Sequence, residues 1–113
     1  MGKQKHLGEF EQLALLAVQR LGADAYGARI QKELEETAGR EASISAIYIT
    51  LTRLEQKGLV ASWMGEPSDA RGGKARRYFR VEPEGLRALY DSRSGLLSMW
   101  NGIEQDLEAA RGD

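Results

Sequence analysis

The chain has no cysteine among its 113 residues and only one histidine. Without cysteine it has no disulfide bond, no thiolate nucleophile and no cysteine-ligated zinc site. The one histidine, His6, is too few for the usual imidazole metal clusters, and its polar surroundings indicate an ordinary surface residue. We therefore expect neither a metal nor another cofactor.

Long hydrophobic runs are also missing. No stretch of about 18 apolar residues occurs, and the first six residues lead into no signal-type hydrophobic segment. We expect a cytoplasmic protein that does not enter a membrane. The sequence also offers no nucleophile with an activating base, and Glu33, Glu35 and Glu36 lie on the charged face of a predicted helix. We predict that the chain is not an enzyme.

The net charge is small but unevenly distributed. The formal charge is −1, which by itself argues against binding to phosphates. Residues 43–80, however, hold seven lysine and arginine residues against three acidic residues, a local charge of +4. One basic region on an otherwise acidic body favours nucleic acid binding at that region.

Hydrophobic periodicity predicts three helices before residue 60. Apolar residues at helical spacing predict the first helix over residues 9–21. A second helix is predicted from Asp24, a good N-cap, to Gly39. A third helix is capped by Ser43 or Ser45.

In the third helix, Ile47, Leu51 and Leu54 are predicted to face inward. At about 100° per residue, this orientation turns a short polar face outward. The outward face is formed by Ser45, Ile49, Thr52, Arg53 and Gln56, with Tyr48 at its side.

Two predicted strands enclose a basic loop. Residues 59–64 and 75–81 alternate in the manner of half-buried strands. Residues 65–74 between them are rich in turn-forming residues. The segment therefore predicts a hairpin with a long tip.

The segment after Pro83 is predicted to form one helix that ends at residue 109 or 110. Its apolar residues follow the spacing of a coiled-coil seam. Because a lone surface helix does not need such a stripe, we predict a homodimer interface. The predicted interface residues are Leu86, Leu89, Tyr90, Arg93, Leu96, Leu97, Trp100, Ile103 and Leu107, with Leu15 of the first helix.

The order helix, helix, short strand, helix, strand, basic loop, strand, helix is typical of a winged helix-turn-helix, a mainly α (α+β) fold. We expect residues 7–82 to form the DNA-binding domain and residues 83–110 the dimerisation helix, as one globular unit. In this architecture the third helix enters the major groove and the hairpin contacts the flanking backbone or minor groove. The predicted DNA-binding residues are Ser43, Ser45, Tyr48, Ile49, Thr52, Arg53, Arg71, Lys74, Arg76 and Arg77.

These assignments have plainer alternatives. Arg53 binds a phosphate or a guanine edge, or else it faces solvent or pairs with Glu41 or Glu55. Ile49 meets a thymine methyl group, or it packs on a neighbouring element. The basic loop is the stronger indication of DNA contact, because its paired glycines allow it to follow a sugar-phosphate backbone.

Several short motifs occur in a fixed order along the chain. They are Leu7-Gly8 with Glu11, Ala25-Tyr26-Gly27, Ile47-Tyr48 with Leu51, Arg53-Leu54-Glu55-Gln56-Lys57-Gly58-Leu59-Val60, and Gly72-Gly73-Lys74-Ala75-Arg76-Arg77-Tyr78-Phe79-Arg80-Val81. Together these motifs resemble the PadR family of transcriptional regulators over residues 7–90. The single short C-terminal helix is similar to that of the smaller PadR subfamily.

The resemblance implies a dimeric repressor whose wings flank a palindromic operator and whose DNA affinity is relieved by a small planar or phenolic effector. Trp100 and Tyr90 are the candidate effector pocket, and plain interface core is the alternative for Trp100. Ile49 stands where many relatives have a polar residue. The alternative function is a winged-helix adaptor that binds protein without binding DNA.

Overall fold

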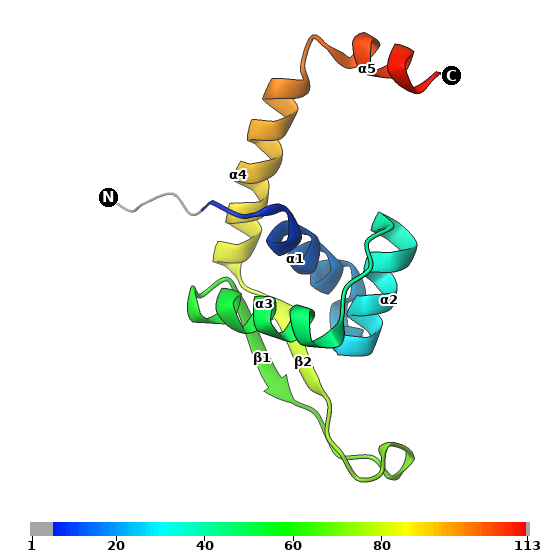
Figure 1. The fold of residues 1–113 in the computed structure, drawn as a ribbon. Coiled ribbons are helices and arrows are strands. Elements are labelled where there is room, and N and C mark those ends of the chain that lie inside the picture. Colours follow the sequence, from blue (N-terminus) through cyan, green and yellow to red (C-terminus); the bar gives the residue numbers. More distant parts are fainter. Residues whose placement is uncertain (1–5, 113) are drawn as a thin grey trace.

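The computed structural model describes residues 6–112 as a body of three helices with a projecting hairpin and a long C-terminal helix (Figure 1). This arrangement confirms the predicted winged helix-turn-helix, except that the short strand predicted before the third helix is not formed in residues 39–43. In chain order, the helices and strands are α1 (Glu9–Leu21), α2 (Gly27–Ala38), α3 (Ile44–Gln56), β1 (Val60–Met64), β2 (Arg77–Val81), α4 (Pro83–Trp100) and α5 (Glu104–Arg111).

The hydrophobic core lies between the three body helices and one face of the hairpin. Ile47, Leu51 and Leu54 of α3 are fully buried, as predicted. They belong to one cluster with Phe79 and Val81, which alternate along β2. Burial of large aliphatic side chains contributes about 1.5–3 kcal/mol each, so this cluster fixes α3 relative to the hairpin.

The second helix begins at Gly27, later than predicted, because β2 holds the preceding residues extended. Asp24 lies in a 3-10 turn instead of acting as an N-cap. The carbonyl of Ala25 accepts a hydrogen bond of 2.9 Å from the amide of Phe79, and Tyr26 forms an isolated bridge with Tyr78. Because the paired residues lie far apart in the sequence, a local sequence pattern cannot predict this pairing.

The third helix is capped by Ser43 rather than Ser45. The Ser43 hydroxyl accepts a hydrogen bond of 3.0 Å from the amide of Ala46. This bond satisfies one of the amides that the start of a helix leaves unpaired. Ser45 lies within the helix and is exposed.

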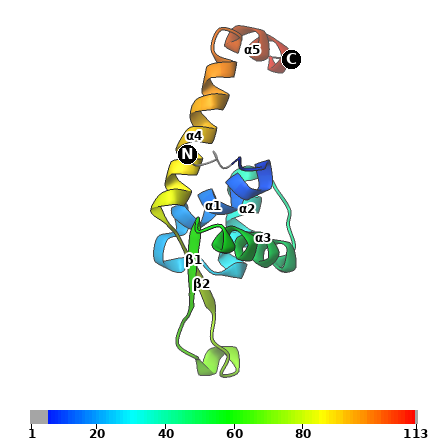
Figure 2. The same ribbon diagram turned by 90° about the vertical axis from the view of Figure 1, so that its left-hand side faces the viewer.

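The hairpin forms the wing, residues 60–81. Its strands are antiparallel, with Val60 opposite Val81 and Met64 opposite Arg77. The wing tip, residues 65–76, includes a 3-10 turn over Asp69–Arg71. Figure 2 shows that the wing and α4 leave the helical body at opposite ends.

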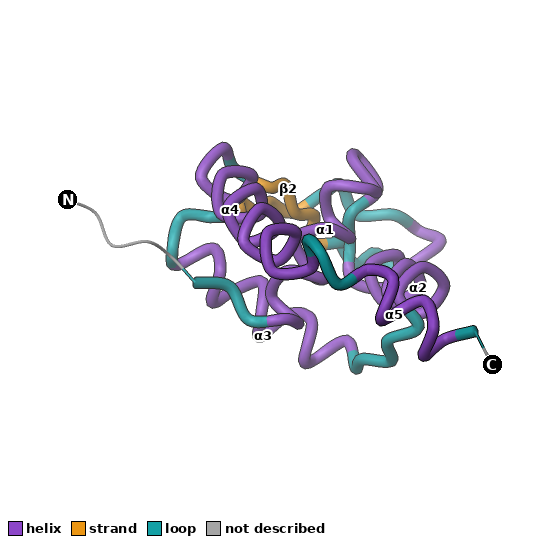
Figure 3. Tube along the Cα trace, turned by 90° about the horizontal axis from the view of Figure 1, so that it is seen from above, coloured by secondary structure: helices purple, strands orange, loops and turns teal. Residues whose placement is uncertain are grey.

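The C-terminal segment forms two helices, which corrects the prediction of one helix to residue 109 or 110. The helix breaks between Trp100 and Glu104, where Gly102 has a φ of 93°. The amide of Gly102 donates a hydrogen bond of 2.9 Å to the carboxylate of Glu104. Seen from above, α4 lies over α1, and α5 turns away from the axis of α4 (Figure 3).

No helix within residues 6–112 has both the length and the hydropathy to cross a bilayer.

Candidate nucleic-acid interface

The outer face of α3 points away from the core. Ser45, Arg53 and Gln56 are exposed, and Ile49 is 58% exposed. This orientation agrees with the predicted facing of the helix, and among residues 6–112 it leaves Ile49 mostly uncovered instead of packed on a neighbouring element. A shallow hollow of about 360 Å³ runs along this face and is lined by Tyr48, Ile49, Thr52, Arg53 and Gln56.

The wing continues this surface beyond α3. A second hollow of about 460 Å³ is lined by Tyr48, Met64, Ala75, Arg76 and Arg77. Tyr48 lines both hollows. The outer face of α3 and the wing therefore form one continuous surface, which we call the DNA-facing surface.

The cations of the wing tip are held to different degrees. Arg71 donates hydrogen bonds to the carbonyls of Glu66 and Lys74, at 2.9 and 3.3 Å. The guanidinium of Arg76 lies 4.0 Å from the centre of the Tyr26 ring. Lys74 is exposed, and in the described part of the chain its side chain has no partner.

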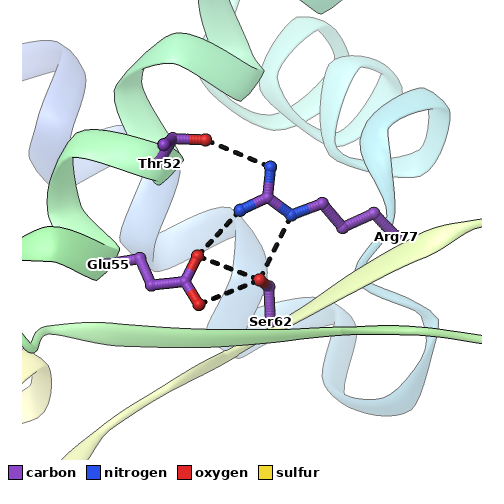
Figure 4. A network of polar contacts seen from close by, with 4 residues as sticks. All are labelled: Thr52, Glu55, Ser62 and Arg77. Atoms are coloured by element: carbon purple, nitrogen blue, oxygen red, sulfur yellow. Dashed lines mark hydrogen bonds and ion pairs between the residues drawn. The ribbon is translucent and has the colours of Figure 1, made fainter.

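Arg77 does not extend from the wing tip, although the sequence grouped it with the other wing cations. Its guanidinium turns toward α3 and forms an ion pair with Glu55 at 2.7 Å (Figure 4). It also donates to Thr52 Oγ1 at 3.1 Å and to Ser62 Oγ at 3.2 Å. The Ser62 hydroxyl in turn donates to the Glu55 carboxylate at 2.9 Å.

We call these four residues the Arg77 network. It joins α3, β1 and β2 through polar contacts and lies beside the DNA-facing surface. The side chains of Arg77 and Glu55 are 29% and 35% exposed. Arg77 also lies 4.8 Å from the centre of the Phe79 ring, which limits its movement.

The predicted DNA-binding residues thus separate into three groups, one of which is formed by Arg71, Lys74 and Arg76 of the wing tip. Ser43 is occupied as an N-cap and Arg77 is held within the network, whereas Ser45, Tyr48, Ile49, Thr52 and Arg53 share the outer face of α3. The predicted DNA-binding residues do not include Gln56 and Met64, which line the hollows. Spacing along α3 identifies Gln56, but no local pattern identifies Met64.

The family model of the transcriptional regulator PadR-like family matches residues 15–91. The chain belongs to this family. The matched stretch includes all of α3 and the wing, and it ends within α4. No curated protein matches the chain.

Solved structures with this fold include several PadR-family regulators. A PadR family transcriptional regulator from Eggerthella lenta is 29% identical, with a TM-score of 0.66 over 88% of this chain and 87% of that chain. A PadR family transcription regulator from Clostridium difficile is 24% identical, with a TM-score of 0.68 over 88% and 99%. A complex structure of hsRosR-S4 is 26% identical, with a TM-score of 0.65 over 96% and 87%.

This PadR-like chain is therefore a DNA-binding transcriptional regulator with a winged-helix fold. Its family and its structural neighbours are regulators rather than enzymes. The DNA-facing surface is the part of the molecule where the predicted contact residues gather.

The PadR-like chain has a second exposed surface, which is apolar and lies between α1 and α4. We call it the α1–α4 groove. It encloses about 470 Å³ and is lined by Gln12, Leu16, Gln19, Leu86, Leu89, Tyr90, Arg93, Leu96, Leu97 and Trp100.

One residue of the predicted dimer interface lies elsewhere. Leu15 is fully buried in the core of its own chain, whereas the adjacent Leu16 is 44% exposed and lines the groove. The broad apolar face of α1 covers both sides of the helix, so spacing alone does not separate these two residues. Ile103 and Leu107 follow the break after α4 and do not continue its stripe.

Proposed function

We propose that the chain is a homodimeric repressor that recognises a palindromic operator in duplex DNA. The observation that carries the proposal is the continuity of α3 and the wing across Tyr48. On this surface Arg53 and Ile49 are available for base edges, where arginine suits guanine and an apolar side chain suits the thymine methyl group. Lys74 is available for a phosphate.

The exposed apolar lining of the α1–α4 groove supports dimer formation. Leu86, Leu96 and Trp100 are 43%, 52% and 46% exposed, which is unusual for several large apolar side chains that line one groove. A second copy has the same surface, so two α4 helices can cover each other in an isologous contact. Because the wing lies at the other end of the body, such pairing leaves both DNA-facing surfaces uncovered.

In such a dimer, two α3 helices recognise half-sites about one helical turn apart. The two α3 helices occupy successive major grooves on one side of the duplex, and the two-fold symmetry of the dimer accounts for a palindromic operator. The protein acts in the cytoplasm, and the winged-helix part (7–82) and the C-terminal segment (83–110) work as one unit.

We extend the proposal to relief of repression by a small planar or phenolic effector. Tyr90 and Trp100 both line the α1–α4 groove and present aromatic surface to it. A planar ring stacks favourably against such side chains. We suppose two arrangements of the subunits, of which only one binds DNA. An effector that binds the groove more tightly in the other arrangement lowers DNA affinity, at most by the ratio of its affinities for the two arrangements. Plain interface core is the alternative role for Trp100.

Fluorescence polarisation tests the proposed function directly. The duplexes are the chain's own promoter region, an operator selected from a random pool, and a scrambled operator of equal composition. We expect preference for the first two and an affinity that falls steeply with salt, because cationic side chains displace counterions from phosphates. Binding without salt dependence, or without preference over the scrambled duplex, would favour the protein-binding adaptor instead.

A titration with planar phenolic compounds tests the effector. The Trp63→Phe variant leaves Trp100 as the single tryptophan, so quenching of its fluorescence reports occupation of the groove. We expect compounds that quench Trp100 also to release the operator. Quenching without release of the operator would show that a compound binds the groove but does not relieve repression. Release of the operator without quenching would show that the effector binds at another site.

A further inference from the structure

Thr52 is the residue at which the Arg77 network meets the outer face of α3. It lines the hollow on that face. On its other side, its Oγ1 accepts a hydrogen bond of 3.1 Å from Nη1 of Arg77 (Figure 4). Thr52 therefore contacts both the internal network and the surface where a base edge would lie.

A hydroxyl has one proton to donate and two lone pairs that accept. In the part of the chain that the structure describes, Arg77 is the only hydrogen-bond partner of the Thr52 hydroxyl. Arg77 donates to one lone pair of the Thr52 hydroxyl. The hydroxyl proton can therefore be donated to an acceptor on another molecule. The adjacent cation also disfavours approach of a second donor, and it strengthens the hydroxyl as a donor.

Arg77 is fixed well enough to impose this direction. Glu55 binds its Nη2 at 2.7 Å and Ser62 binds its Nε at 3.2 Å, so three nitrogens of the guanidinium each have a partner. A planar guanidinium held at three points has one orientation, in contrast to the mobile ammonium of lysine.

We propose that Arg77 is a specificity-determining positioning residue that makes Thr52 a donor to a purine N7 in each half-site. This inference rests on the proposed function. N7 is an acceptor on both guanine and adenine, and each base pair has only one N7 in the major groove. A hydroxyl that donates there distinguishes purine from pyrimidine at that position on one strand, without distinguishing guanine from adenine.

Replacement of single operator purines by their 7-deaza analogues tests the inference, because the analogue has a C–H in place of N7. For the wild-type chain we expect an affinity loss of about fivefold at one purine of each half-site, the size of one neutral hydrogen bond. Thr52→Val should bind unmodified operator about fivefold more weakly and show no further loss at that purine. Thr52→Ser, which keeps the hydroxyl, should retain the loss.

Arg77→Lys separates positioning from a direct phosphate contact. Lysine keeps the charge but does not reproduce the three-point arrangement of the guanidinium. We expect this variant to lose the 7-deaza effect while its salt dependence stays that of the wild type. If Arg77 instead bound a phosphate directly, Arg77→Lys would keep the 7-deaza effect, and Arg77→Gln would reduce the slope of log K against log salt by about one.

The outcomes distinguish this inference from the proposed function. A 7-deaza effect that persists in Thr52→Val or in Arg77→Lys overturns the inference and leaves the repressor intact. A wild-type chain that prefers its operator but tolerates every 7-deaza purine does the same. A wild-type chain without any sequence preference overturns the proposed function and the inference together.

Discussion

The cations on the DNA-facing surface differ in what holds them. Arg71 donates to two backbone carbonyls and Arg76 lies over a tyrosine ring. Lys74 is the exposed cation at the wing tip, and Arg53 is the exposed cation of α3. These differences predict separate effects on affinity and on sequence preference.

Lys74→Ala should weaken binding to all duplexes alike. Its ammonium is suited to phosphate, so its loss should reduce the slope of log K against log salt by about 0.9. Arg53→Ala and Ile49→Ala should instead change the order of preference among operator variants, because their side chains lie where base edges are expected. Polarisation measurements on a set of single-substituted operators check both expectations. Equal losses on every sequence for all three variants would contradict this division.

Glu55 compensates the charge of Arg77 next to the DNA-facing surface. Glu55→Gln should therefore strengthen binding to scrambled duplex, since the guanidinium then adds its full charge to the surface. The same change should lower the free energy of unfolding by only about 0.5–1 kcal/mol, because the pair is partly exposed.

Glu35→Gln on the exposed side of α2 is the matched control for that change. It alters the net charge equally but lies outside the network. Polarisation and urea unfolding are the measurements. Equal strengthening by both variants would attribute the effect to net charge alone and contradict a local role of Glu55.

Glu33 joins α1 to α2 and is predicted to titrate unusually. The hydroxyl of Thr37 donates to its carboxylate at 2.7 Å and Arg20 binds it at 2.6 Å. The hydrogen bond from Thr37 contributes most to lowering the pKa of Glu33 below its ordinary value, and the contact with Arg20 lowers it further. Because this pKa is lowered, the ionised carboxylate stabilises the fold at pH values above the ordinary pKa of glutamate. The contribution is lost as the pH falls through the lowered pKa of the folded state. Carboxyl NMR should show Glu33 with a pKa below the ordinary value of a glutamate, and Thr37→Ala should raise that pKa toward the ordinary value.

Residue spacing in the sequence correctly assigns the buried and exposed sides of α3, because a helix has a fixed angle per residue. Spacing does not assign Arg77, whose partner Glu55 lies 22 positions earlier in the chain and meets it only when the hairpin folds against α3. It also does not separate Leu15 from Leu16, because α1 is apolar on two sides and only the packed core shows which residue is covered.

At the scale of elements, α4 begins in close contact with the segment that links α3 to β1. Gly85 is buried there, and a side chain at this position would collide with the carbonyl oxygen of Leu59 and with Val81. Gly95 lies in the same helix with no atom near its Cβ position. The two glycines are therefore a matched pair within one helix.

Gly85→Ala should destabilise the protein by about 1–3 kcal/mol, because backbone must move to admit the methyl group. Gly95→Ala should stabilise α4 by up to about 1 kcal/mol, since alanine is the better helix former. Thermal unfolding followed by circular dichroism checks both. A stabilising Gly85→Ala would show that helix propensity, rather than the contact with Leu59, decides the effect at Gly85.

Element boundaries depend on contacts that the sequence does not contain. Predicted elements match the structure where periodicity is strong, as in α1 and in both strands of the wing. The start of α2 depends on the bridge between Tyr26 and Tyr78, which joins segments distant in sequence. The break after Trp100 depends on the backbone at Gly102 and interrupts a seven-residue repeat that continues in the sequence.

At the scale of the whole molecule, the α1–α4 groove and the DNA-facing surface occupy different ends of the body. The proposed dimer, formed through the groove, would bind two half-sites at once. Linked binding of this kind strengthens affinity by roughly 10²–10⁴ relative to one site. Disruption of the groove should therefore weaken operator binding without any change at α3.

Leu96→Glu and Met99→Glu test this connection. Both residues are exposed on α4, at 52% and 77%, but only Leu96 lines the groove. A carboxylate at position 96 would lose its hydration in the apolar interface of a dimer, which is strongly unfavourable. We expect Leu96→Glu to sediment as a monomer and to lose at least about a hundredfold in operator affinity, whereas Met99→Glu should remain dimeric. Because the change lies far from α3, the monomer should keep its weak affinity for scrambled duplex. Loss of that affinity as well would indicate a folding defect, and a dimeric Leu96→Glu would place the interface on another surface.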